Sequence, residues 1–342
     1  MFTNPNLLFF SVFILTRILL VVSVFFLAQT LFRNKLVSYL AVIAVLIIRG
    51  NIGMVPGSYD ILDNIAFPFF LAIPFLLFSL TFFLKKKYII SSLLLAISFY
   101  LHATTSIFLL LVYGFYFLVY FKRINKKVVL SVILFLIITF PILFRSIMSD
   151  TSISDFSLWF NFLKLRVSGH FFPSTWPFLN TSLFFVLIAM FIISLKYEQD
   201  KTRKNEVIIL SLGSLLLLLI SFIFTEIYPV GFVIQTSLFR GIVVFRVIAL
   251  IYVINFIVNS FKYKSKMLLA SGMALLLIST AIIPVFTGAQ KGVFSDVNIP
   301  GDTELSESES LSTKEEYTAQ ETVESSNESD LKKNDEPRNY EL

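Results

Sequence analysis

The chain has 342 residues, of which 56% are hydrophobic and 40 are phenylalanine, and its mean hydropathy is +0.83. A soluble domain cannot hide that much apolar surface from water, so the composition predicts an all-α integral membrane protein. The chain contains no cysteine, which excludes disulfides, thiolate metal sites and cysteine nucleophiles.

The formal net charge of +6 combines two halves of opposite sign. Residues 1–287 contain 23 Lys and Arg against 8 Asp and Glu, net +15, whereas residues 288–342 contain 5 against 14, net −9. We therefore expect a polytopic transmembrane domain over 1–287 and an acidic tail over 288–342. The tail is nearly free of large aliphatic residues, which predicts disorder.

Ten apolar runs follow one another along the first part, which predicts about ten transmembrane helices. Their approximate bounds are 7–31, 36–48, 65–84, 88–101, 106–121, 128–147, 183–195, 207–227, 236–261 and 267–287. The second, fourth, fifth and seventh runs are short for a full span, and tilted or re-entrant helices would accommodate them.

Every second loop between these runs is basic. The five basic loops contain Arg33 and Lys35; Lys85, Lys86 and Lys87; Lys122, Arg123, Lys126 and Lys127; Lys196, Lys201, Arg203 and Lys204; and Lys262, Lys264 and Lys266. The positive-inside rule places these loops in the cytoplasm and both termini outside. Short basic loops between spans are topology signals, and no nucleic-acid partner is expected.

The longest outer loop covers residues 148–182. Apolar residues recur in it at helical spacing, which predicts a helix lying flat in the outer interface: Ile153, Phe156, Phe160, Leu163 and Val167. The same loop contains the stretch LRVSGHFFPSTW, which includes one of the two histidines of the chain.

Two arginines lie near the middle of apolar runs, where a charge costs at least about 2.5 kcal/mol. Arg17 and Arg246 are each ten residues into a run, about 15 Å deep at the rise of an α-helix. Gln235 precedes Arg246 by eleven residues, which on one continuous helix returns to nearly the same face. Arg240 lies near the outer end of the same run, within reach of Glu226.

Two interpretations of these arginines stay open: interhelical ion pairs, or an anion site that opens outward. Arg49, Arg145 and Arg166 favour the second, because topology places them on the same side and a guanidinium suits phosphate. His102 and His170 also belong to this side, each as a structural residue or as a group that transfers protons near neutral pH.

Five carboxylates lie on the predicted outer side ahead of the tail, and one of them is a candidate general base: Asp60, Asp63, Asp150, Asp155 and Glu226. The chain has no glycine-rich phosphate loop, no HExxH zinc motif and no GxSxG motif. We predict no metal site built on histidine; Mg²⁺ is the cofactor that the carboxylates are suited to hold.

The region from residue 57 to 111 resembles a family of bacterial polytopic membrane proteins. Their pattern is Gly-Ser, an acidic residue, a proline-containing span, a basic turn, and a span ending in His-Pro-Thr. Gly57, Ser58, Pro68 and His102 occupy those places, and Ala103 stands where proline is common.

Two further motifs carry the resemblance. The family tends to have Arg-x-x-His-His-x-x-Pro in an outer loop, which Arg166, His170 and Pro173 match, with Gly169 in place of the first histidine. A later Gln…Arg span in these proteins resembles Gln235 and Arg240.

In layout, this family is similar to C-type glycosyltransferases and polysaccharide polymerases, which use polyprenyl-phosphate-linked sugars at the outer leaflet. The resemblance covers roughly residues 5–285 and implies a multi-pass protein of the bacterial inner membrane whose partner is a lipid-linked sugar or another anionic lipid. It implies substrate-binding and catalytic roles for the following residues: Arg166, Arg240, Arg246, Gln235 and His102 for binding, His170 for proton transfer, and Asp60 or Asp63 as the base.

C-type enzymes usually place their catalytic carboxylate in the first outer loop, after a span that starts in the cytoplasm. This chain is expected to begin outside, so the resemblance implies that one span and its acidic loop are missing ahead of residue 1. Asp60 or Asp63 would then take the place of that acid.

Two alternative functions stay open. A transporter or lipid flippase for an anionic substrate would use Arg17 and Arg246 to bind the anion in mid-membrane. A non-catalytic membrane assembly subunit would use its acidic tail to recruit partners.

Overall fold

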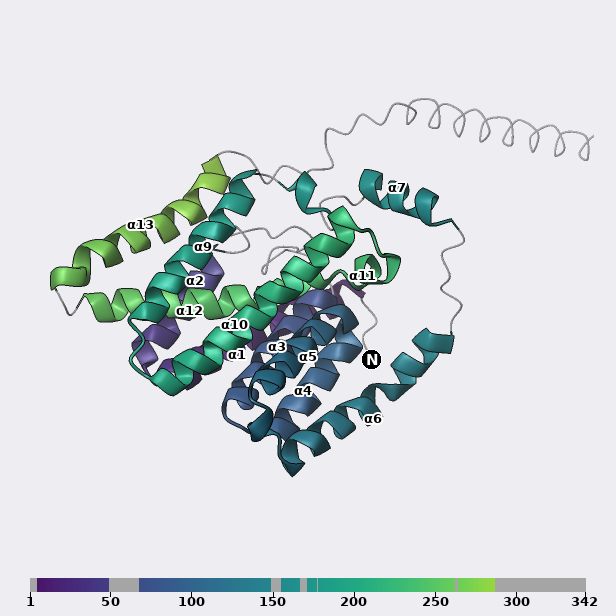
Figure 1. Cartoon of the computed structure of the whole chain (residues 1–342). Helices are drawn as coiled ribbons and strands as arrows, with labels where there is room; N and C mark the ends of the chain where they lie inside the picture. The colour runs from purple at the N-terminus through teal and green to yellow at the C-terminus, as the bar shows by residue number, and fades with distance from the viewer. Residues whose placement is uncertain are drawn as a thin grey trace, which may run out of the picture. The chain divides into compact units, whose positions relative to one another are not determined.

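The computed structural model of the protein describes residues 5–48, 68–148, 155–166, 171–176, 178–261 and 264–286. All of them lie in the first of two units into which the chain divides, Met1–Thr287. The second unit, Gly288–Leu342, corresponds to the predicted acidic tail and lies outside the described residues. The described part of the chain consists of helices joined by short turns, and no strand occurs in it (Figure 1).

The helices follow the apolar runs of the sequence. In chain order they are α1 (Pro5–Phe32), α2 (Lys35–Ile48), α3 (Pro68–Leu84), α4 (Tyr88–Leu101), α5 (Ala103–Val119), α6 (Lys126–Met148), α7 (Phe156–Arg166), α9 (Phe178–Lys196), α10 (Lys201–Phe222), α11 (Gly231–Thr236), α12 (Ile242–Ser260) and α13 (Lys264–Phe286). Short turns of other helical types connect some of them: η1 (Phe121–Arg123), η2 (Pro173–Thr175), η3 (Ile223–Ile227) and η4 (Leu238–Gly241).

Within the described residues, four helical segments are long and apolar enough to cross a membrane: Leu7–Phe32, Lys126–Arg145, Lys201–Ile227 and Gly231–Ser260. Six shorter apolar helices accompany them: Lys35–Ile47, Pro68–Leu84, Tyr88–Leu101, Ala103–Val119, Thr181–Lys196 and Lys266–Ile278. The predicted all-helical fold is thus confirmed for the described residues and is compatible with a membrane protein, while the number of ten spans stays a prediction. All four runs predicted to be short belong to the shorter group.

Large apolar side chains point away from the protein on several helices. Ile137 of α6 is 66% exposed and Leu268 of α13 is 87% exposed. Only 22% of the residues in the most apolar 18-residue stretch of α1 are buried, and the share in α6 is the same. Such outward apolar faces are unfavourable in water and suit a hydrocarbon environment.

Helix α12 lies at the centre of the packing. It contacts α1, α2, α3, α9, α10 and α13 (Figure 1), and most of its side chains are buried. The sequence of α12 explains this position, because apolar residues occupy every face of the helix.

Small polar residues lie where α3, α4 and α6 pack together. Ser79 Oγ donates to the carbonyl of Ser91 at 2.9 Å, and Ser92 Oγ donates to the carbonyl of Ser131 at 2.5 Å. Hydroxyls of this kind allow close helix packing in a membrane and satisfy their own hydrogen-bonding groups inside the protein.

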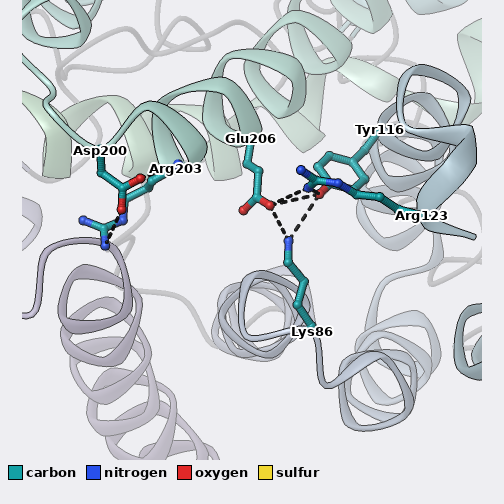
Figure 2. Close-up of polar contacts among 6 residues, drawn as sticks. All are labelled: Lys86, Tyr116, Arg123, Asp200, Arg203 and Glu206. Atoms are coloured by element: carbon teal, nitrogen blue, oxygen red, sulfur yellow. Dashed lines mark hydrogen bonds and ion pairs between the residues drawn. The ribbon is translucent and has the colours of Figure 1, made fainter.

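A buried carboxylate joins three turns at one end of the helices (Figure 2). Glu206, near the start of α10, accepts from Lys86 Nζ and from Arg123 Nη1, both at 2.6 Å. The Tyr116 hydroxyl lies between them, 3.2 Å from Lys86 Nζ and 2.7 Å from Arg123 Nη1. Lys86 belongs to the α3–α4 turn and Arg123 to the turn after α5, so the cluster holds both turns against α10.

The other two basic turns lie at the same end. Arg203 of α10 places its guanidinium 5.9 Å from the Phe32 ring, at the end of α1. Lys266 of α13 places Nζ 4.6 Å from the ring of Tyr197, which follows α9. The five basic loops therefore lie at the same end of the helices, which we call the basic end.

We predict that the Glu206 cluster is strongly non-additive. The Glu206 side chain is 9% exposed, whereas Lys86 and Arg123 are 41% and 37% exposed, so the carboxylate is the group that depends on its partners. Lys86→Met or Arg123→Met alone should cost about 1 kcal/mol or less, because one cation still neutralises Glu206. Both together should cost about 3 kcal/mol, because a buried charge is left without an ionic partner.

The measurement is unfolding of the purified protein in detergent. Glu206→Gln added to the double variant is the control, because it removes the stranded charge and should restore part of the lost stability. A triple variant no more stable than the double variant would contradict this explanation.

A second prediction concerns the close approach of η4 to α5. A Cβ atom on Gly241 would lie 2.0 Å from Phe108 Cγ, whereas a Cβ on Gly114 of α5 would meet nothing within 4 Å. Gly241→Ala should therefore destabilise the protein by about 1–3 kcal/mol or more, and Gly114→Ala should not. The measurement is the unfolding temperature of each variant. As a control, Gly241→Ala should be less destabilising in a Phe108→Ala background, because the ring that the new Cβ would contact is gone. Equal unfolding temperatures of Gly241→Ala and Gly114→Ala would refute the prediction.

Candidate functional site

A second group of polar residues lies at the opposite end of α4, α5 and α12, which we call the His102 end. Helix α4 stops and α5 starts at the single residue His102, whose backbone is extended with φ −155°. The apolar segment of α12 is also interrupted there: α11 ends at Thr236, Ser237 has the left-handed φ of 45°, and η4 follows. Irregular backbone within apolar segments of membrane proteins occurs where it lines a site or is covered by protein.

The two interruptions bring together a histidine and an arginine that are 138 residues apart. Arg240 Nη1 lies 3.4 Å from His102 Nε2. Because arginine has only donors, His102 Nε2 is the acceptor, and the proton of the neutral ring resides on Nδ1. Nδ1 in turn faces two hydroxyl oxygens, Thr104 Oγ1 at 3.1 Å and Thr105 Oγ1 at 3.2 Å.

The imidazole is neutral in this position. Burial, together with the Arg240 cation, lowers the pKa of His102 from 6.5 to about 4. The His102 ring also packs edge-on against Phe69 of α3, with the centroids 5.2 Å apart. The pair therefore has a single positive charge at neutral pH, on the guanidinium, and suits an anionic group rather than a cation.

Part of the long predicted outer loop lies beside this pair. The Trp176 ring packs edge-on against Phe239, the neighbour of Arg240, at 5.2 Å. Glu226 accepts a hydrogen bond from the backbone N–H of Ser174 at 2.7 Å. Glu226 itself belongs to the π-helical turn η3 at the end of α10, and such turns are frequent at functional sites.

A helix is present where the interfacial helix was predicted: α7 covers Phe156–Arg166, whereas Ile153 and Val167 lie outside the described residues. Asp155 caps its start by accepting from the backbone N–H of Leu158 at 2.9 Å. Phe160 packs edge-on against the buried Phe172, and the ammonium of Lys164 lies over both rings. The described flanks of the LRVSGHFFPSTW stretch are thus attached to the His102 end.

The structure places the other predicted site residues as follows. Arg246 is 4% exposed inside α12, six residues beyond Arg240 and so about 9 Å deeper along the axis. Gln235 is exposed on α11, and the left-handed Ser237 breaks the helix between Gln235 and Arg246, so the spacing argument for a shared face does not apply. Arg17 is partly buried, with its guanidinium 4.6 Å from the Phe13 ring.

The remaining predicted residues are not placed by the structure. Asp60, Asp63 and His170 lie outside the described residues, and Arg166 ends α7 with a side chain that is likewise outside them. Within the described ranges, no group of three or more His, Asp or Glu is arranged to hold a metal ion. The prediction that carboxylates hold Mg²⁺ depends on Asp60 and Asp63 and stays a prediction.

Sequence reasoning missed three features of the two ends. Thr104 and Thr105 follow His102 directly, and their hydroxyl groups were the available signal for a ring held in one tautomer. The Glu206 cluster was hidden among basic loop residues, although a lone carboxylate at the start of an apolar run was a signal. The helix break occurs at Ser237, which is neither glycine nor proline, so the residue itself does not predict a break.

Comparison with known proteins adds no relative: no family model matches the chain, and neither a curated protein nor a solved structure is significantly similar to it.

We predict that His102 makes the protein sensitive to acid. Its folded pKa of about 4 lies below the ordinary 6.5, so the unfolded chain takes up a proton first as pH falls. The stabilising contribution is complete above about pH 6.5 and is lost progressively toward pH 4. Unfolding temperatures measured from pH 7.5 to 4 should therefore fall less steeply for His102→Gln than for the wild type. Parallel curves would show that His102 is not held neutral.

Proposed function

We propose that the protein is a multi-pass membrane protein that binds the phosphate of a lipid-linked sugar at the His102 end and acts as a glycosyltransferase or polysaccharide polymerase. The single observation that carries this proposal is the contact between Arg240 and a neutral His102 at a double interruption of apolar helices. A guanidinium held by a neutral ring keeps its full charge, and it can donate further hydrogen bonds to phosphate oxygens.

In the proposed reaction, a hydroxyl of the acceptor attacks the anomeric carbon of the sugar. The bond from that carbon to the phosphate oxygen breaks, and the electron pair leaves with the polyprenyl phosphate. The hydroxyl proton passes to Asp60 or Asp63, with His170 assisting its transfer. Arg240, Arg246 and Arg166 stabilise the negative charge that grows on the leaving phosphate, which is where cationic groups contribute most to such a step.

Two features support a lipid-linked substrate over a soluble one. Several helices have exposed apolar side chains that suit hydrocarbon, so a polyprenyl chain has a surface to lie against. Trp176 and Phe239 lie beside Arg240, and aromatic rings of this kind are common at the level of lipid headgroups. Gln235, exposed on α11, is the adjacent polar group for the sugar.

The break at Ser237 also favours a second candidate, a transporter or flippase for an anionic lipid, because interrupted helices line the substrate sites of many transporters. In that case Arg240 and the deeply buried Arg246 would bind the phosphate in succession. Binding alone does not separate the two functions, whereas transfer of the sugar does. A non-catalytic assembly subunit would show neither transfer nor phosphate selectivity.

The test is binding of a polyprenyl phosphate and of the uncharged polyprenol to protein in lipid nanodiscs. We expect Arg240→Gln to weaken the phosphate about tenfold or more, as loss of a charge-assisted hydrogen bond implies, and to leave the polyprenol unchanged. Lys122→Gln, at an exposed cation of the basic end, is the matched control and should have no effect. Equal affinity of wild type and Arg240→Gln for the phosphate would refute the proposed site.

A further inference from the structure

A cavity of about 330 Å³ lies at the basic end, far from the His102–Arg240 pair. It opens between the α1–α2 turn, the α9–α10 turn, the last turns of α12 and the start of α13. Helix α12 separates the two regions by its own length of 19 residues, about 28 Å. The volume falls in the range of small-molecule sites, and the wall is mostly polar, which is unusual beside apolar helices.

One wall residue has an acceptor for which the described residues supply no donor. Glu198 Oε1 accepts from the backbone N–H of Asp200 at 3.0 Å, but Oε2 is buried and has no hydrogen-bond partner among the described residues. A buried carboxylate oxygen without a donor is costly. The cavity beside it is the place from which a donor, above all a cationic N–H group, can reach it.

The rest of the wall has the opposite charge. Lys266 holds its ammonium 4.6 Å from the Tyr197 ring. Arg203 is already paired, with Nη2 3.2 Å from Asp200 Oδ2, and its guanidinium retains further donors. Among the described residues, the wall therefore contains the carboxylate Glu198 and the two cationic side chains Lys266 and Arg203.

Neutral polar and aromatic groups complete the wall. Asn259 Nδ2 donates to Asn255 Oδ1 at 2.9 Å, which fixes both amides on one side of α12. The Tyr197 ring packs against Phe256 with centroids 4.9 Å apart, so a short apolar surface lies between the charged groups. A ligand that matches all of these features has a positive group and a negative group joined by a short alkyl chain.

We propose that this cavity binds a phosphoethanolamine group, with the primary ammonium on Glu198 and the phosphate on Lys266 and Arg203. A primary ammonium supplies the N–H donors that Glu198 Oε2 needs, and two cations suit a phosphate better than a singly charged group. The group can come from free phosphoethanolamine or from the headgroup of phosphatidylethanolamine in the leaflet next to the basic end. This site does not depend on the function proposed for the His102 end.

The experiment titrates full-length protein, in nanodiscs of phosphatidylcholine, with O-phosphoethanolamine, phosphocholine, ethanolamine and inorganic phosphate. We expect saturable binding of phosphoethanolamine, and binding at least tenfold weaker for phosphocholine, whose methylated nitrogen has no N–H to donate. Ethanolamine and inorganic phosphate, each with half of the group, should also bind more weakly. The proposal would be overturned if phosphoethanolamine did not bind, either as the free molecule or as the lipid headgroup. Binding of phosphocholine with the same affinity as phosphoethanolamine would also overturn it.

A second arm identifies the source of the group. If the lipid is the source, nanodiscs that contain phosphatidylethanolamine should raise the unfolding temperature of the wild type above that in phosphatidylcholine, and added phosphoethanolamine should then have little effect. If the free molecule is the source, only soluble phosphoethanolamine should raise it. Either result supports the site. If neither the lipid nor the free molecule raises the unfolding temperature, the proposal is contradicted.

The variants localise the binding. Glu198→Gln keeps an acceptor for Asp200 and should weaken phosphoethanolamine about tenfold or more. Without ligand, this variant should be at least as stable as the wild type, because the buried charge without a donor is removed. Asp155→Asn, at an exposed helix cap of α7, is the matched control and should bind normally. Lys266→Gln tests the proposed phosphate-binding side of the cavity. It should weaken the binding of both phosphoethanolamine and inorganic phosphate. Normal binding by both cavity variants would place the ligand elsewhere and overturn the assignment.

Discussion

Helix α12 is surrounded by other helices, so every polar group along it has to find a partner inside the protein rather than in water. Apolar side chains occupy nearly all of its positions, and Arg246 is the only charged residue in its sequence. Polar chemistry is consequently concentrated where α12 starts, beside Arg240, and where it ends, beside Asn255 and Asn259. The Arg240 region and the region of Asn255 and Asn259 thus lie at the two ends of one buried helix.

Each end has its own way of satisfying buried polar groups. At the basic end, Glu206 is neutralised by Lys86 and Arg123, which come from two other turns. A carboxylate that would be costly to bury alone thus connects α10 to both turns. At the His102 end, the interruptions at His102 and Ser237 leave room for a guanidinium and an imidazole to meet. The first arrangement is closed by protein groups, whereas the second joins a guanidinium to a neutral ring, and the proposed substrate site lies there.

Much of the fold could be predicted from hydropathy, because apolar runs of sufficient length form helices wherever they are buried or face lipid. The alternation of basic loops similarly indicated which turns share an end. The site was less predictable: His102 and Arg240 were both identified as candidates, but their contact depends on the left-handed Ser237, which nothing in the local sequence indicates. The same break invalidates the helical spacing from Gln235 to Arg246, and Glu206 was obscured because its basic neighbours were interpreted as topology signals alone.

The claim on which the account depends most is that the two ends of α12 face opposite sides of a membrane. The chain has no cysteine, so single cysteines introduced at the exposed Tyr228 and Lys122 can be labelled with a membrane-impermeant maleimide without background. We predict that Tyr228→Cys, near the His102 end, is labelled in intact cells and that Lys122→Cys, at the basic end, is labelled only after the membrane is opened. Labelling of both positions from the same side would contradict the account.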